Sequence, residues 1–216
     1  MPARPFGGAR YGGTQRGATR SRAARGATGR GFTLIEGLVV LLFVTMLVAL
    51  GFPALQQMIH RSRLEGTARE CAVLCQRARL EAIKQGVPVV VRFDTTDRTV
   101  ESWLDADGNG TQEPTETEFA IVTLPGTIDY LAPTSQEEVW IDNGSGENVD
   151  SEGGWLTFFT DGSIDFTGDV RFGDSRQNYL QLSLGPVATG QVELSKWDEE
   201  LDEWLQPRED RPWKWN

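Results

Sequence analysis

Apolar residues follow one pattern over the first part of the chain and another over the next. From Phe32 to Leu55 the chain is apolar on nearly every side, and Glu36 is its one charge. A helix over these residues is long enough to span about 30 Å of hydrocarbon. From residue 56 to 86 the apolar residues recur at three- and four-residue spacing, which is typical of an amphipathic helix. We therefore predict one helix that ends near Gly86, with a transmembrane half (32–55) and an amphipathic half (56–86).

After Gly86 the pattern changes to β-branched and aromatic runs separated by turn residues, which predicts strands. The expected strands are residues 87–94, 99–105 and 118–125, with 128–133 either a strand or a loop edge. Residues 155–166 predict a hairpin around Asp161-Gly162, and 178–185 pairs with 189–197 in another. The polar residues 134–153, interrupted by the sequence VWID, predict a long loop. The predicted fold is α+β, a long helix packed on an antiparallel sheet of about six or seven strands.

Charge is divided unevenly along the chain. Residues 1–31 hold seven arginines and no acid, which leaves 14 basic and 31 acidic residues in 32–216. The head is rich in Gly, Ala, Arg, Thr and Ser and cannot form a core. A basic N-terminal segment, then an apolar stretch, then an acidic remainder is the order typical of an exported, membrane-inserted protein. In such a protein the basic N-terminal segment stays in the cytoplasm. The acidic body also argues against nucleic acid as the main partner.

Two segments resemble a known family. The stretch RGFTLIEGLVVLLFVTMLVALGFPALQ resembles the N-terminal prepilin segment of the type IV pilin superfamily, which includes the pseudopilins of type II secretion. It has a basic leader that ends at Gly31, followed by Phe32 and the sequence TLIE. Residues 155–197, with WLTFFTDGSIDF and NYLQLSLGPVATGQVEL, resemble the GspH/FimT group of minor pilins and pseudopilins. The resemblance implies a pilin-like fold, with a GspH/FimT-like domain over 87–197 and an acidic, Trp-rich tail over 198–216.

The resemblance also assigns roles to residues at the start of the helix. It implies that a prepilin peptidase removes the leader 1–31 by cutting after Gly31 and methylates the new N-terminus, Phe32. Glu36 would then pair with the terminal amine of a neighbouring subunit during assembly. A charge in hydrocarbon costs about 2.5 kcal/mol or more, and such a pair would remove two unpaired charges at once. The alternative is a plain signal anchor that tolerates one Glu. Gly37 stands where the family usually has a large apolar residue.

The function that the resemblance implies is structural. We expect a minor pseudopilin or pilin in the bacterial inner membrane, single-pass, with its C-terminal domain in the periplasm. Its expected partners are other pilin or pseudopilin subunits, the prepilin peptidase and membrane lipid. The sequence has no G-x-S-x-G and no phosphate loop, so we expect no enzyme and no organic cofactor. The alternative is a DNA-uptake minor pilin, a binding module of the same fold, but GQVELSKWDEELDE is acidic where such a surface would need arginines.

One loop has the spacing of a calcium site. DADGNGTQEPTE (105–116) places Asp105, Asp107, Asn109 and Glu116 in the register of a calcium loop, with Gly110 at the turn. The alternative is a polar hairpin loop, because Asp, Asn and Gly are also common turn residues. The strand-like flanks and Pro114 favour that alternative. Both interpretations remain open at this point.

The cysteines and the tail each allow a simple interpretation. Cys71 and Cys75 lie four apart on the predicted helix, and the chain has only one His, so we expect two buried apolar residues rather than a zinc site. In the tail, Trp197, Leu201 and Trp204 fall at helical spacing with Leu205, and acids lie opposite. The tail is either a closing element packed on the sheet or an exposed docking peptide.

Overall fold

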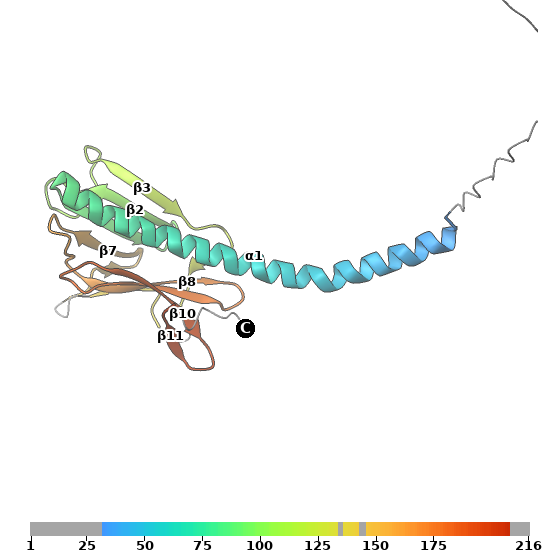
Figure 1. The fold of residues 1–216 in the computed structure, drawn as a ribbon. Coiled ribbons are helices and arrows are strands. Elements are labelled where there is room, and N and C mark those ends of the chain that lie inside the picture. The colour runs from blue at the N-terminus through green and yellow to red at the C-terminus, as the bar shows by residue number, and fades with distance from the viewer. Residues whose placement is uncertain (1–31, 134–135, 143–145, 208–216) are drawn as a thin grey trace, which may run out of the picture. The chain divides into compact units, whose positions relative to one another are not determined.

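The computed structural model describes residues 32–133, 136–142 and 146–207, so the predicted leader (1–31) lies outside the described residues (Figure 1). The chain divides into two compact units, Met1–Met46 and Leu47–Asn216. One helix, α1 (Leu34–Gln85), begins and ends within two residues of the predicted bounds. At its C-terminal end, the N–H of Gly86 donates to the carbonyl of Ala82 at 3.0 Å. Gly86 has a φ of 68°, the left-handed cap conformation that glycine favours.

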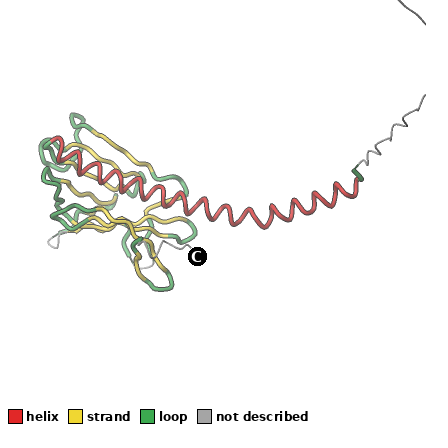
Figure 2. The backbone as a smooth tube through the Cα atoms, in the orientation of Figure 1, coloured by secondary structure: helices red, strands yellow, loops and turns green. Residues whose placement is uncertain are grey.

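The strands form two antiparallel sheets (Figure 2). The first has the order β3-β2-β1-β7-β6 and the second the order β11-β10-β9-β8-β4, with β5 also paired to β8. The bounds in the first sheet are β1 (Val89–Asp94), β2 (Thr99–Leu104), β3 (Glu118–Thr123), β6 (Val149–Asp150) and β7 (Gly153–Phe158). Those in the second are β4 (Ile128–Tyr130), β5 (Val139–Asp142), β8 (Thr167–Asp174), β9 (Tyr179–Leu184), β10 (Val192–Asp198) and β11 (Glu203–Leu205).

The predicted single sheet was therefore wrong, although the antiparallel α+β class was right. The long loop predicted over 134–153 was also wrong, because it contains β5 and β6. β5 lies along β8, with Val139 opposite Val170. This pairing is between segments far apart in the sequence, so the local composition of 134–153 does not reveal it.

The hairpin predicted over 155–166 is only half correct. Its turn forms at Asp161-Gly162, where the N–H of Phe159 donates to the carbonyl of Ser163 at 2.8 Å. The returning segment makes a single bridge, Phe158 to Ile164, and then leaves for the second sheet as β8. The hairpin of β9 and β10 is confirmed, with Leu182 opposite Leu194.

A stripe of small and branched side chains on α1 packs against both sheets. Leu64, Ala68, Cys71, Cys75, Ala78 and Ala82 are fully buried in one cluster. The same cluster contains Phe93 and Phe158 of the first sheet and Phe172 and Leu180 of the second. The prediction of a helix packed on antiparallel strands is thus confirmed.

Both cysteines belong to this stripe, as predicted. Cys71 and Cys75 are buried and form no disulfide. Burial raises the pKa of the Cys71 thiol to about 12, with Glu70 adding to the rise. A thiol with so high a pKa stays protonated and unreactive at neutral pH.

Ala78 gives a direct test of this packing. We expect Ala78→Leu to destabilise the protein by about 1–3 kcal/mol, because the larger side chain must displace neighbours in a close-packed core. Gln76→Leu on the exposed side of the same helix is the matched control and should change stability by less than about 0.5 kcal/mol. The measurement is the thermal midpoint of the purified chain in detergent. Equal midpoints for the two variants would contradict the packing described here.

Candidate functional site

The start of α1 is built around a capping threonine. The backbone N–H of Glu36 donates to Thr33 Oγ1 at 3.2 Å, and the N–H of Gly37 donates to the Thr33 carbonyl at 3.1 Å. Thr33 is therefore the N-cap, with Glu36 three residues later, the order of a capping box. A carboxylate in the first turn also interacts favourably with the helix dipole. Glu36 thus has a local role at the helix start in addition to the role predicted in assembly.

The described side chains of the apolar half of α1 are uncovered. All side chains from Leu34 to Leu50 are exposed, and α1 is the one described helix long and apolar enough to cross a membrane. Phe32 is 78% exposed. An apolar surface of this extent needs lipid or another chain to cover it. Gly31, the predicted cleavage residue, lies outside the described residues.

Three of the four predicted calcium ligands converge in the loop between β2 and β3. One carboxylate oxygen from each of Asp105, Asp107 and Glu116 lies within 4.8 Å of the others. The fourth predicted ligand, Asn109, is joined to them through its amide, which donates to Asp107 Oδ2 at 2.8 Å. Converging oxygen ligands are what a hard cation such as calcium requires.

The same carboxylates already accept hydrogen bonds from the loop backbone. Asp105, which is 2% exposed, accepts N–H bonds from Gly108, Asn109 and Gly110 at 2.8–3.1 Å. Glu116 accepts the N–H of Ala106 at 2.9 Å. These bonds hold the loop closed. They are compatible with a polar hairpin loop and with a calcium site, so both interpretations stay predictions.

The tail closes the second sheet as a strand. β11 pairs with β10 so that Trp204 lies opposite Trp197, and their rings meet edge to face at 5.1 Å. Trp204 Nε1 donates to Gln136 Oε1 at 3.1 Å, and the guanidinium of Arg171 lies 5.9 Å from the Trp204 ring centre. The closing-element interpretation holds for residues 203–205, whereas the helical spacing was misleading. Residues 208–216 lie outside the described residues.

Arg171 is the buried polar residue that supports this tail, and the sequence does not predict that role. Its Nε donates to Gln181 Oε1 at 2.9 Å, and Gln181 Nε2 donates to Asp169 Oδ1 at 2.9 Å. Burial lowers the pKa of the Arg171 guanidinium, while Asp169 and Glu137 oppose that shift. A single Arg in a strand with alternating polarity gives no sequence signal for such a network.

The sequence model of the family described as type II transport protein GspH matches residues 67–186. The chain belongs to the GspH family. No curated protein sequence gives a significant match. The match begins within the amphipathic half of α1 and ends just after β9.

The solved structures that match part of this chain include minor pseudopilins and a minor pilin. Two structures of EpsH from the type II secretion system of Vibrio cholerae share 14% and 13% identity, each with a TM-score of 0.42. They cover 61% of this chain and 95% and 93% of their own. The type IV minor pilin FimU of Pseudomonas aeruginosa shares 16% identity with a TM-score of 0.39, covering 62% of this chain and 90% of its own.

Family membership confirms the main functional prediction. GspH proteins are structural components of a pseudopilus or pilus rather than enzymes, and the DNA-uptake alternative is not favoured. The matched range 67–186 does not include Gly31, Phe32 or Glu36. The processing and assembly roles of these three residues therefore stay predictions.

The loop at 105–116 yields a test by metal removal. Because its carboxylates already accept backbone N–H bonds, we expect the thermal midpoint to be the same in millimolar calcium and in chelator. Asp105→Ala should lower the midpoint in both buffers, since it removes the acceptor of three part-buried backbone hydrogen bonds. A midpoint that rises with calcium in the parent chain and not in Asp105→Ala would instead establish a metal site.

Proposed function

We propose that this chain is a minor pseudopilin of a type II secretion pseudopilus, processed by a prepilin peptidase after Gly31 and methylated at Phe32. Residues 32–55 anchor it in the inner membrane, with the GspH domain in the periplasm. The observation that carries the proposal is the helix start at Thr33, with Glu36 in its first turn and an exposed apolar stretch behind it, on the same chain as a GspH domain. EpsH, similar in fold, is a minor pseudopilin of a type 2 secretion system.

The assembly role of Glu36 follows from where it lies. Its neighbours Leu34, Ile35 and Leu38 are 58–88% exposed, so lipid or other subunits must surround this turn. A carboxylate in such surroundings is costly unless a cation meets it. A new amine at Phe32, created by cleavage, would place a cation at the same level in every subunit. Pairing between neighbouring subunits would then favour ordered addition to a filament.

The arrangement of charges supports a protein–protein role over DNA binding. Arg92 forms ion pairs with Asp150 and Glu152 at 3.4 and 3.0 Å. Arg98 pairs with Asp129 at 3.2 Å, and Arg171 with Asp169 at 3.5 Å. Cations paired within the domain are poorly placed to neutralise phosphates, which is what DNA affinity requires.

Processing can be tested by intact mass. The chain extracted from membranes should have lost residues 1–31 and gained one methyl group. Gly31→Leu should block the cut and retain the leader, whereas Gly29→Leu, two residues upstream, should be processed normally. A parent chain that keeps Met1 and the leader would overturn the proposal.

Assembly can be tested at Glu36 separately from processing. Glu36→Gln should leave insertion and cleavage intact but reduce incorporation into filaments, because it keeps the shape and removes the charge. Thr33→Ala removes the cap, at a cost of about 1 kcal/mol to the helix start, and keeps the carboxylate. Cross-linking of membrane fractions measures incorporation. Equal defects in the two variants would mean that Glu36 acts only in capping the helix.

A further inference from the structure

A polar hollow of about 240 Å³ lies beside α1, a few residues past the end of its apolar stretch. Its lining comes from three parts of the chain: Gln57 and Arg61 of α1, residues 176–178 between β8 and β9, and residues 196–199 at the end of β10. These residues belong to the compact unit that begins at Leu47. The large apolar side chains of residues 47–55, in the same unit, are 56–70% exposed. The hollow is therefore next to a surface that needs an apolar cover.

The hollow has the level of lipid headgroups, a statement that rests on the proposed function, in which residues 32–55 span the membrane. Arg61 follows Leu55 by six residues, which is about 9 Å along a helix. The headgroup region adds roughly 5–8 Å to each side of the hydrocarbon. An arginine side chain covers the remaining distance with its apolar stem against the helix and its charge in the headgroup layer. Trp197, which is half-buried and also lines the hollow, is of a residue type enriched at this level.

Two opposite charges in the hollow have no partner among the residues that the structure describes. The guanidinium of Arg176 and the carboxylate of Glu199 form no ion pair there, with each other or with another side chain. Arg61 and Lys196 add positive charge to the same hollow and already interact with other residues. A ligand with one negative and one positive group could lie between Arg176 and Glu199 and pair with both.

The two turns that carry these charges are each held by an aspartate. Asp174 accepts the N–H groups of Arg176 and Asn178 at 2.9 and 3.1 Å. Asp198 accepts the N–H groups of the two residues after Glu199 at 3.0 and 3.2 Å. The backbone on both sides of the hollow is therefore fixed before a ligand arrives, which lowers the entropy cost of binding.

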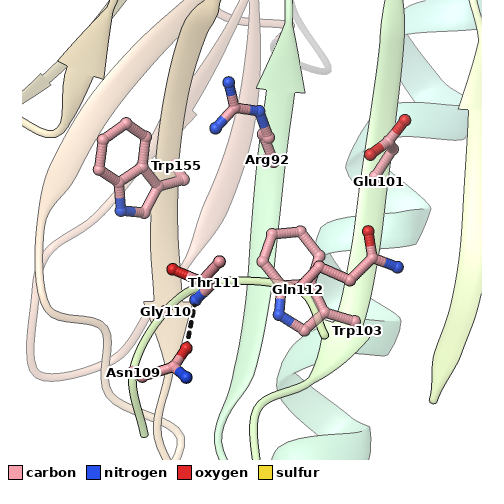
Figure 3. A pocket seen from close by; sticks show the side chains of 8 residues that line it. All are labelled: Arg92, Glu101, Trp103, Asn109, Gly110, Thr111, Gln112 and Trp155. Atoms are coloured by element: carbon pink, nitrogen blue, oxygen red, sulfur yellow. Dashed lines mark hydrogen bonds between the residues drawn. The ribbon is translucent and has the colours of Figure 1, made fainter. Parts of the chain in front are cut away.

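A larger hollow, of about 390 Å³, surrounds Arg92 on the first sheet (Figure 3). Figure 3 shows Arg92 between Trp155 and Glu101, which lie opposite it on the neighbouring strands. Arg92 is already paired with Glu152 at 3.0 Å and with Asp150 at 3.4 Å. Its cation thus gives a ligand little to gain, unlike the guanidinium of Arg176.

We propose that the hollow beside Arg61 binds the phosphoethanolamine headgroup of a membrane phospholipid. Arg176 donates to the phosphate, with Arg61 and Lys196 adding attraction, and Glu199 accepts hydrogen bonds from the ammonium group. Five of the six residues 198–203 are acidic, so a lipid with a net negative charge is repelled here. A choline headgroup has no N–H to donate to Glu199. The zwitterionic headgroup with a primary ammonium is therefore the one that fits.

The test is native mass spectrometry of the full chain in detergent with added lipids of matched acyl chains, which counts the lipids that stay bound. We expect one phosphatidylethanolamine per chain, retained about tenfold more than phosphatidylcholine or phosphatidylglycerol. Glycerophosphoethanolamine, which has the headgroup without the acyl chains, should displace the lipid at millimolar concentration. Inorganic phosphate at the same concentration should not, because it has no ammonium for Glu199.

Three variants locate the site. Arg176→Gln should lower retention about fivefold or more without lowering the thermal midpoint, because Arg176 is exposed and has no partner among the described side chains. Glu199→Gln should remove the preference for ethanolamine over choline. Arg63→Gln is the matched control and should behave as the parent does, since Arg63 is exposed, lies two residues from Arg61 and does not line the hollow.

Three results would overturn the headgroup site. The first is equal retention of the three lipids, which would mean an adventitious additive only, carried over with the detergent. The second is displacement of the lipid by inorganic phosphate, which would make the hollow a simple anion site. The third is an equal loss in Arg63→Gln and Arg176→Gln, which would assign the effect to overall charge. The same spectra show whether residues 1–31 are lost, so failure of the proposed function is distinguishable from failure of this site.

Discussion

Six side chains of α1, spaced three or four residues apart from Leu64 to Ala82, pack in one cluster with both sheets. Five of the six are alanine or cysteine, small residues that let the helix pack against the strands. Separating the helix from either sheet would expose Phe93 and Phe158 on one side or Phe172 and Leu180 on the other. The hydrophobic contribution of such aromatic and leucine side chains is large, so the helix and both sheets are stable only together. The same helix also contains the exposed apolar stretch, so this stretch and the helical part of the core belong to one continuous element.

The sequence predicts the parts of this fold whose signals are local. The change from a helical to an alternating period marks the end of α1 at Gly86, and Asp161-Gly162 marks a turn. The local sequence does not predict β8, because its Gly168 and Gly173 are residues typical of turns. A Cβ at Gly168 would lie 2.6 Å from the carbonyl oxygen of Trp140. Only glycine therefore lets the backbone of β5 come this close to β8. The division into two sheets depends on such non-local pairings, which composition does not report.

The tail shows how one spacing can fit two structures. Trp197 and Trp204 are seven residues apart, which places them on one face of a helix and equally opposite each other in a short hairpin. The turn decides between them: Asp198 Oδ1 accepts the N–H groups of Glu200 and Leu201 at 3.0 and 3.2 Å, and Asp202 has a φ of 52°. Asp and Asn tolerate this conformation, and their side chains form such turns. Gln136 and Arg171 contact Trp204 from distant positions in the chain. The sequence of the tail alone therefore cannot predict these contacts.

Local motifs and features of the folded chain differ in the same way. Gly31, Phe32 and Glu36 lie within six positions, so their motif can be recognised from the sequence alone. The structure adds the helix cap at Thr33 to it. The unpartnered Nε1 of Trp103 differs from this motif, because Trp103 of β2 becomes buried only when strands and loops from distant parts of the chain fold together. A Phe at position 103 would cover the same surface without leaving a buried donor.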